Sequence, residues 1–136
     1  MLEPKRRKYR KEFRGKMRGV SIRGSTLSFG EYGLKALGRG WLSSQQLEAG
    51  RRAITHGLKK GGRVWTRVFP GKPVSARPAG QRMGGGKGEV EKYVAVITPG
   101  KIIYEITGVS YDVGKNALER AAAKLPFQSK LVKKEE

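Results

Sequence analysis

The sequence predicts an α+β fold: a single-domain sandwich of a mixed or antiparallel sheet packed with two helices, with a basic N-terminal extension and a long Gly-rich loop. Two segments repeat apolar residues at helical spacing, and short β-branched or aromatic runs lie between glycines and prolines. A chain of 136 residues has the length of one ordinary domain. We therefore expect a tail over residues 1–24 and a folded domain over residues 25–136.

The domain is expected to begin with two short strands, residues 27–29 and 33–37, in a glycine-punctuated stretch. A helix should follow, because Ser43 and Gln46 have the spacing of a capping box and Gly61-Gly62 provides a stop signal. The expected core side of this helix carries Leu47, Gly50, Ala53, Ile54 and Leu58, and the other side carries Arg52, His56, Lys59 and Lys60. The pattern predicts one core face and one cationic face, with His56 as an ordinary surface residue.

The next expected strand covers residues 63–69, in which Arg63, Trp65 and Arg67 alternate with β-branched residues. Pro70 closes it, because proline cannot continue the backbone hydrogen bonding of a strand. Residues 70–89 then contain three prolines and six glycines. We expect a connection without secondary structure there, and a loop of that length in a compact domain is commonly functional or disordered.

The C-terminal part is expected to contain a hairpin, a second helix and a last strand. Residues 89–97 and 101–107 read as strands, and Thr98-Pro99-Gly100 between them has the composition of a turn. A helix over residues 110–124 would place on one side Val113, Ala117, Leu118, Ala121 and Leu125. Pro126 should end that helix before a strand over residues 127–132.

The positive charge lies mainly in two stretches that contain almost no acid. Residues 1–24 hold ten Lys or Arg against two Glu, and residues 49–88 hold ten against none. Residues 25–48 are balanced, and residues 89–136 carry a net charge of +1 out of the total of +19. Such a concentration of cations becomes favourable beside a dense polyanion, because binding releases counterions. Nucleic acid is therefore the expected partner.

An anionic membrane surface is the main competitor, but no run of about 18 apolar residues provides an anchor. The chain has no cysteine and one histidine, which excludes thiolate metal sites, cysteine nucleophiles and clusters of histidine ligands. We expect no cofactor, no bound metal and no catalysis. The Gly-rich loop also fails the P-loop pattern, because Gln81 stands where a glycine is required and Gly88 stands where a serine or threonine is required.

Residues 1–24 lack apolar periodicity, so we expect this tail to be mobile in the free protein and ordered by its partner. Tyr9 and Phe13 among arginines and lysines suit RNA, because rings stack on unpaired bases. The alternative is that these two rings pin the tail onto the domain. Glycines of the loop can likewise let the backbone approach a sugar-phosphate chain, with a disordered linker as the alternative.

A series of motifs that spans essentially the whole chain resembles the bacterial-type large ribosomal subunit protein sixteen family. The motifs are Met1-Leu2-x-Pro4-Lys5-Arg6, Tyr9-Arg10-Lys11, Phe29-Gly30-x-Tyr32-Gly33-Leu34, Gln46-Leu47-Glu48-Ala49-Gly50-Arg51-Arg52-Ala53, Arg67-Val68-Phe69-Pro70-x-Lys72-Pro73, Arg82-Met83-Gly84-x-Gly86-Lys87-Gly88, Pro99-Gly100-Lys101-Ile102-Ile103-Tyr104-Glu105 and Ala121-Ala122-Ala123-Lys124-Leu125-Pro126. The resemblance implies a non-catalytic protein that joins the large subunit late in assembly and lies beside aminoacyl-site tRNA near the peptidyl transferase centre.

The charge pattern and the resemblance together indicate site residues. Residues expected to bind rRNA are Lys5, Arg6, Arg7, Lys8, Arg10, Lys11, Arg14, Arg51, Arg52, Lys59 and Lys60. The tRNA-proximal loop is expected to use Arg77, Arg82, Met83, Gly84, Gly86 and Lys87. The residue that matches Arg82 is hydroxylated in some bacterial members. Gly71 and Gly85 stand where the family often has Asp and Lys, so this loop should carry less charge.

The expected partners are large-subunit rRNA, aminoacyl-site tRNA with peptidyl-site tRNA as a further candidate, and neighbouring ribosomal proteins. Neither a membrane partner nor a homo-oligomer is expected. The expected location is the large subunit of a cytoplasmic bacterial ribosome, with an organellar ribosome as the alternative. A free nucleic-acid-binding chaperone or regulator with the same RNA-binding domain over residues 25–136 is the alternative function.

Overall fold

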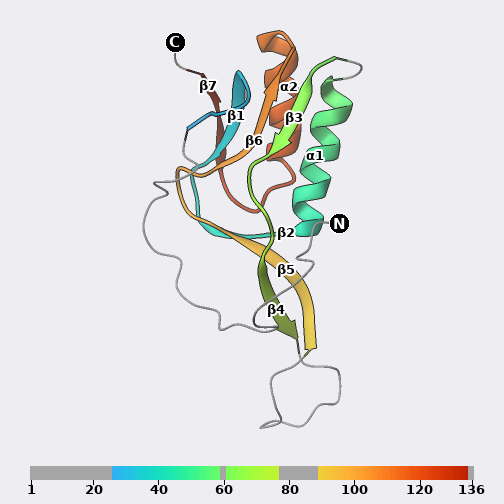
Figure 1. Ribbon diagram of the computed structural model, residues 1–136, viewed down its shortest axis with the longest axis vertical. Helices are drawn as coiled ribbons and strands as arrows, with labels where there is room; N and C mark the ends of the chain where they lie inside the picture. The colour runs from blue at the N-terminus through green and yellow to red at the C-terminus, as the bar shows by residue number, and fades with distance from the viewer. Residues whose placement is uncertain (1–25, 59–60, 77–88, 135–136) are drawn as a thin grey trace.

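The computed structural model describes residues 26–58, 61–76 and 89–134, so the expected tail and the centre of the expected loop lie outside the described residues (Figure 1). The strands are β1 (Tyr32–Ala36), β2 (Gly40–Ser43), β3 (Arg63–Thr66), β4 (Lys72–Ala76), β5 (Glu89–Ile97), β6 (Ile102–Thr107) and β7 (Ser129–Lys133), and the helices are α1 (Ser44–Leu58) and α2 (Tyr111–Ala122). The predicted α+β single domain with two helices is confirmed.

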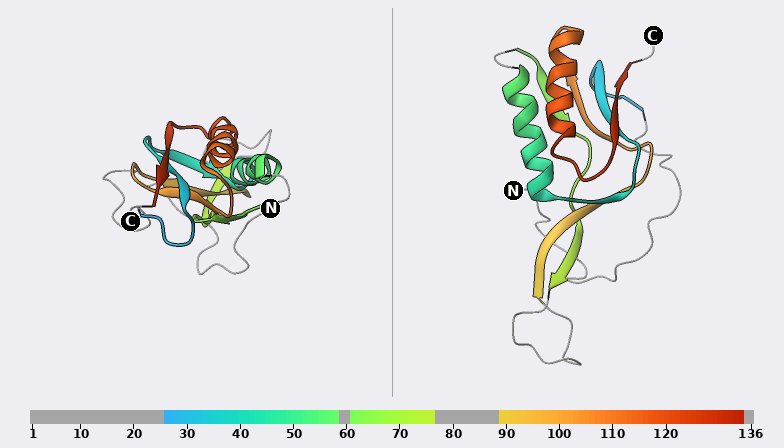
Figure 2. Two further views of the ribbon diagram at one scale, coloured as in Figure 1. Left: turned by 90° about the horizontal axis from the view of Figure 1, so that it is seen from above. Right: turned by 180° about the vertical axis from the view of Figure 1, so that it is seen from behind.

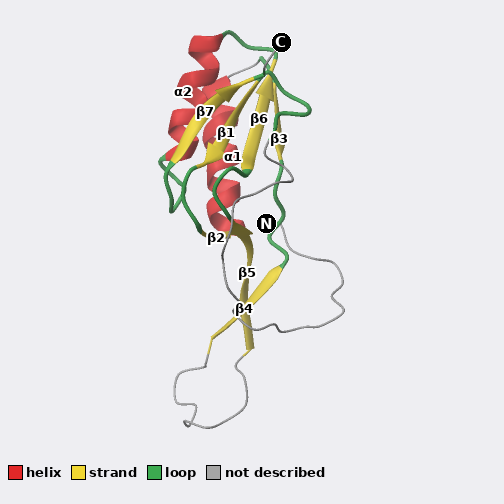
Figure 3. Ribbon diagram, turned by 90° about the vertical axis from the view of Figure 1, so that its left-hand side faces the viewer, coloured by secondary structure: helices red, strands yellow, loops and turns green. Residues whose placement is uncertain are grey.

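The strands form two antiparallel sheets where one sheet was expected. A four-stranded sheet has the order β3-β6-β1-β7, and a three-stranded sheet has the order β2-β5-β4. Both helices cover one face of the four-stranded sheet (Figure 2). The β4 strand and the part of β5 that pairs with it extend away from the four-stranded sheet and the helices, and we call this pair the arm (Figure 3).

The expected hairpin between residues 89–97 and 101–107 is wrong, because β5 and β6 belong to different sheets. Each of these strands is already flanked by two others, so neither has a free edge for its neighbour in the chain. The chain crosses between the sheets beside the end of β1, where the Gly100 N–H donates to the Ala36 carbonyl and the Ala36 N–H donates to the Lys101 carbonyl, each at 2.8 Å. Gly100 has a φ of 95°, which favours glycine.

Three further expectations about strands are corrected. Residues 27–29 are not a strand, and β2 was not predicted. The strand expected over residues 63–69 ends at Thr66. Residues 70–89 are not free of secondary structure, because β4 pairs with the start of β5 and leaves residues 77–88 as the connection. Pro73 is tolerated in β4 because that strand lies at the edge of its sheet.

The predicted capping box at the start of α1 is confirmed. The Ser43 N–H donates to Gln46 Oε1 at 3.0 Å, and the Gln46 N–H donates to Ser43 Oγ at 3.2 Å. The predicted core face is buried through Leu47, Ile54 and Leu58, each of which contributes roughly 1.5–3 kcal/mol by leaving water. This burial fixes which side of α1 faces solvent.

The second helix is capped by Ser110, whose Oγ accepts a hydrogen bond from the Val113 N–H at 3.5 Å. Ala117, Leu118 and Ala121 are buried as predicted, but Val113 is 38% exposed and was wrongly assigned to the core side. Gly114 faces the sheet instead, where a Cβ would lie 3.0 Å from Ile106 Cδ1. Small residues therefore set how closely α2 packs.

The central strand β6 is buried along Ile102–Ile106, which requires cover on both faces of the sheet. The helices cover one face, and Tyr104 reaches α1 there, where its hydroxyl donates to the Leu47 carbonyl at 2.5 Å. On the opposite face, Leu27 lies beside Ile102. The Cδ2 atom of Leu27 occupies the space into which a Cβ on Gly33 would project. We call this second face the outer face.

Candidate nucleic-acid interface

A short segment before β1 is held on the outer face by one buried carboxylate. The backbone N–H groups of Ser28, Phe29 and Gly30 donate to Glu105 Oε1 at 2.8, 2.9 and 3.0 Å. The other carboxylate oxygen of Glu105 accepts a hydrogen bond and ion pair from the Arg67 guanidinium. These contacts fix the segment over β6, and we call them the Glu105 clamp.

Burial alone would raise the pKa of Glu105, whose side chain is fully inaccessible to solvent. The hydrogen bonds from Gly30, Arg67, Phe29 and Ser28 outweigh that effect and hold the pKa below its ordinary value. The carboxylate is therefore charged at neutral pH, and its charge is directed into the protein.

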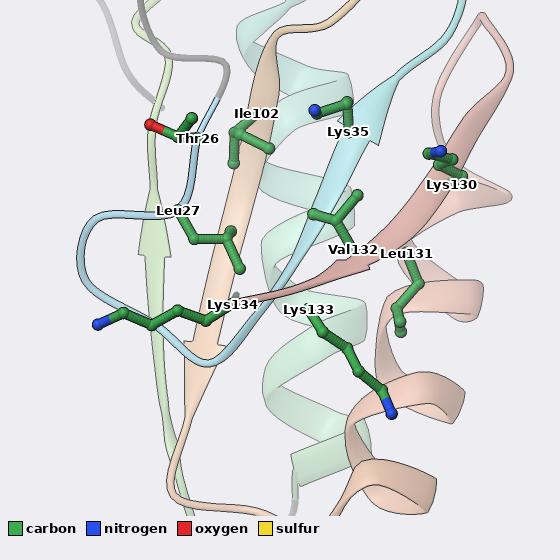
Figure 4. Close-up of a pocket in the computed structure, with 9 residues that line it drawn as sticks. All are labelled: Thr26, Leu27, Lys35, Ile102, Lys130, Leu131, Val132, Lys133 and Lys134. Atoms are coloured by element: carbon green, nitrogen blue, oxygen red, sulfur yellow. The ribbon is translucent and has the colours of Figure 1, made fainter. Parts of the chain in front are cut away.

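A lysine-rich groove of about 600 Å³ lies beside the clamped segment, between it and β7 (Figure 4). Its lining residues are Thr26, Leu27, Lys35, Ile102, Lys130, Leu131, Val132, Lys133 and Lys134. Lys133 turns toward α2, where its Nζ lies 4.0 Å from the centroid of the Tyr111 ring. The other three lysines border the groove, and none of its lining residues is acidic.

Two of these lysines lie directly opposite each other in the sheet. Lys35 of β1 and Lys130 of β7 are partners in the antiparallel register. Like charges in that position destabilise a sheet by themselves. An anion between them would remove the repulsion, so the register favours a phosphate-binding role for the groove.

The predicted cationic face of α1 contains an ion-pair cluster. Arg51 donates to both carboxylate oxygens of Glu48, at 2.5 and 3.1 Å, and Arg52 Nε lies 3.4 Å from Glu48 Oε1. The hydrogen bond from Arg51 lowers the pKa of Glu48, and the same bond raises that of Arg51. The side chain of Arg52 is 72% exposed and that of Arg51 is 40% exposed. Arg52 is therefore the more available cation.

A cleft of about 340 Å³ connects this helix face to the edge of the four-stranded sheet. Its lining residues are Glu48, Arg51, Thr66, Arg67, Val68 and Phe69. Arg51 of α1 and Arg67, which directly follows the edge strand β3, therefore line the same cleft together with Glu48.

The structure places two of the predicted site residues, Arg51 and Arg52, together on α1. The other predicted site residues lie outside the described residues: those of the tail, the pair Lys59 and Lys60 after α1, and those of the loop from Arg77 to Lys87. Sequence reasoning missed the groove lysines Lys35, Lys130 and Lys134. The net charge of residues 25–48, which include Lys35, is zero and that of residues 89–136, which include Lys130 and Lys134, is +1, so neither segment stood out as basic.

Within the ranges that the structure describes, no group of three acidic or histidine side chains converges in a way that could hold a metal ion. In the same ranges, neither helix has the length and apolar character needed to cross a membrane.

Comparison with known protein families gives a match over nearly the whole chain. The family described as ribosomal protein L16p/L10e matches residues 4–132. The matched range includes β1, the α1 cluster, the arm, residues 77–88 and all of β7 except its last residue, Lys133.

Proposed function

The chain belongs to the ribosomal protein L16p/L10e family and is a structural, non-enzymatic protein of the large ribosomal subunit, and on this premise we propose that it binds large-subunit rRNA and helps to position aminoacyl-site tRNA near the peptidyl transferase centre. It joins the subunit late in assembly, in a bacterial ribosome or, alternatively, an organellar one. The observation that carries the proposal is the family match together with a groove that, among the residues the structure describes, is bordered by lysines and by no acidic side chain.

Attachment is assigned to the body of the protein and the tail. Lys35, Lys130 and Lys134 around the groove, with Arg52 on α1, supply phosphate contacts of the kind that dominate affinity for nucleic acid. The basic tail over residues 1–24 adds ten cations to this attachment. An interface built from many cations tolerates the removal of one or two.

Positioning of tRNA is assigned to residues 77–88. These residues connect Ala76 and Glu89, which pair at the end of the arm away from the helices (Figure 1). Arg77, Arg82 and Lys87 are the cations of this connection. Cations carried on an arm can act at a distance from the attachment surface. A displacement of about 1 Å at the reacting end of the tRNA can cost roughly 100-fold in rate.

Arg82→Ala, or a shortened loop between residues 77 and 88, separates the two roles. Reconstituted large subunits should contain near-normal amounts of either variant, and peptide synthesis should slow because tRNA accommodation is impaired. Lys115→Ala, which removes a cation from an exposed position of α2, is the matched control and should leave synthesis unchanged. Full activity at full occupancy would remove the positioning role, whereas loss of occupancy would make the loop an assembly anchor.

The alternative function is a free nucleic-acid-binding chaperone or regulator with the same domain. It predicts reversible, salt-sensitive binding to many RNAs, whereas a ribosomal component should remain with the large subunit when salt is raised.

A further inference from the structure

Four planar side chains form a stacked row outside the lysine-rich groove: Arg63 and Trp65 of β3, Arg67 just beyond its end, and Phe29 of the clamped segment. Arg63, Trp65 and Arg67 follow one another at alternate positions, so their side chains leave the same side of the strand. The Arg63 Cζ lies 5.9 Å from the Trp65 ring centroid, and the Arg67 Cζ lies 5.3 Å from the Phe29 ring centroid. The Phe29 and Trp65 rings are stacked between them, with centroids 5.9 Å apart and planes inclined at 27°.

The Phe29 ring is held in an exposed position. It is 59% exposed, so it forgoes much of the stabilisation that burial would give a phenyl ring. The Glu105 clamp nevertheless fixes its backbone through the N–H groups of Ser28, Phe29 and Gly30. Gly30 permits this close approach, because a Cβ there would lie 2.6 Å from the Ile106 carbonyl oxygen. The ring is thus preorganised at the surface.

The charge of the row suits a nucleotide. A guanidinium lies at each end, and the carboxylate that neutralises Arg67 is buried beneath the segment. A nucleotide combines a flat, weakly polar base with an adjacent anionic phosphate, so it matches exposed rings flanked by cations. A protein partner would have to bring both an apolar group and a carboxylate to the same place.

We propose that the stacked row binds one unpaired base of large-subunit rRNA, which stacks on the exposed surface of Phe29 while Arg63 contacts a neighbouring phosphate. This proposal rests on the proposed function, which supplies rRNA as the partner. It adds a recognition element for single-stranded RNA to an attachment surface that otherwise contacts phosphates. Thr26 and Leu27 line the groove and Phe29, two residues further along the chain, belongs to the row, so one RNA strand can contact both.

Phe29→Leu in the full-length protein is the direct test, because leucine retains apolar cover over the clamp and removes the ring. Affinity for large-subunit particles that lack this protein should fall by roughly 5- to 150-fold, the range expected when one base stack is removed. The slope of affinity against salt should not change, because every phosphate contact is retained. Phe29→Trp should retain wild-type affinity.

Tyr111→Leu is the matched control. Tyr111 is also an exposed ring with a cation above it, the Nζ of Lys133, but it lies on α2 and outside the row. The affinity of the Tyr111→Leu variant for large-subunit particles should equal that of the wild type. Equal losses for Phe29→Leu and Tyr111→Leu would overturn the proposal, because the row would then have no special role.

Photocrosslinking of the wild-type complex provides a test that does not depend on a folded variant. Phe29 or Trp65 should crosslink to a single unpaired nucleotide, and crosslinks of both residues to protein alone would overturn the proposal. Wild-type affinity of Phe29→Leu would reject stacking while leaving the proposed function intact. Absence of binding by the wild-type protein would instead reject the proposed function.

Discussion

Arg52→Ala should reduce the salt dependence of rRNA binding more than Arg51→Ala does. Both arginines lie on the exposed side of α1, but Arg51 donates to both oxygens of Glu48 and its side chain is 40% exposed. Arg52 makes one contact with Glu48, at 3.4 Å, and its side chain is 72% exposed. A phosphate therefore competes with a carboxylate for Arg51 and finds Arg52 largely available.

The magnitude follows from counterion release. Removal of one cation that neutralises a phosphate should make the slope of log affinity against log salt shallower by roughly 0.7–0.9, so Arg52→Ala should reduce the slope by about that amount. Arg51→Ala should reduce it less, and the double variant by at most about 1.8. Glu48→Gln should have the opposite effect and strengthen binding at low salt, because it releases both guanidinium groups from their anion.

Folding should survive these changes. Ion pairs between residues three or four apart on a helix contribute roughly 0.3–0.5 kcal/mol each, and alanine has the highest helix propensity. Thermal unfolding of each variant checks this point. Arg120→Ala, an arginine removed from the last turn of α2, is the control for loss of charge alone.

The assay is a titration of full-length protein against large-subunit particles that lack it, at salt concentrations from roughly 50 to 200 mM. An unchanged slope for the double variant Arg51→Ala and Arg52→Ala would show that neither arginine contacts a phosphate and that both are ordinary solvent-exposed residues. A slope reduced equally by Arg120→Ala would show that total charge, and not the α1 face, determines binding.

Three further predictions concern packing and electrostatics. Glu105→Gln should destabilise the fold by about 3–5 kcal/mol in denaturant melts, because it leaves the half-buried Arg67 without its anion. A loss below about 1 kcal/mol would contradict a stabilising role of the Glu105 clamp. Because the pKa of Glu105 is lowered in the folded state, its stabilising contribution should be complete above about pH 4.5 and decline as the pH falls, and Glu105→Gln should flatten that dependence. Gly50→Ala should cost roughly 1–3 kcal/mol, because its Cβ would lie 2.3 Å from the Tyr104 hydroxyl; an unchanged melting temperature would show that Tyr104 moves without cost. Lys35→Ala should stabilise the free protein by roughly 0.2–1 kcal/mol by relieving the repulsion between Lys35 and Lys130, and it should weaken rRNA binding. A variant that is more stable and binds rRNA as tightly or more tightly would contradict a phosphate site.

Local signals accounted for the parts of the fold that were predicted well. The capping box of α1 involves residues three apart, and the apolar spacing of both helices depends on neighbours along the chain. Strand pairing depends on distant partners. The sequence of β5 and β6 with a turn between them favours a hairpin, but β2, β4, β1 and β3 occupy their edges.

In the candidate site, too, residues close together in the sequence were predicted and contacts between distant residues were not. Arg51 and Arg52 were predicted from a contiguous motif that resembles the family, and Arg52 also from its position on the cationic side of the predicted helix. Lys35 and Lys130 are far apart in the sequence, and only the register of β1 with β7 brings them together. The Glu105 clamp is equally non-local, because it joins residues 75 to 77 positions apart. Alternation of Arg63, Trp65 and Arg67 was visible in the sequence, but the position of Phe29 between two of them was not.

Sedimentation of large subunits through a high-salt cushion, followed by crosslinking of the protein that remains bound, distinguishes a ribosomal component from a free RNA-binding protein. The protein should sediment with the subunit, and the groove lysines Lys35, Lys130 and Lys134 should crosslink to large-subunit rRNA. Release of the protein into the supernatant, with no rRNA crosslinks from the groove, would contradict this expectation and favour a free nucleic-acid-binding protein.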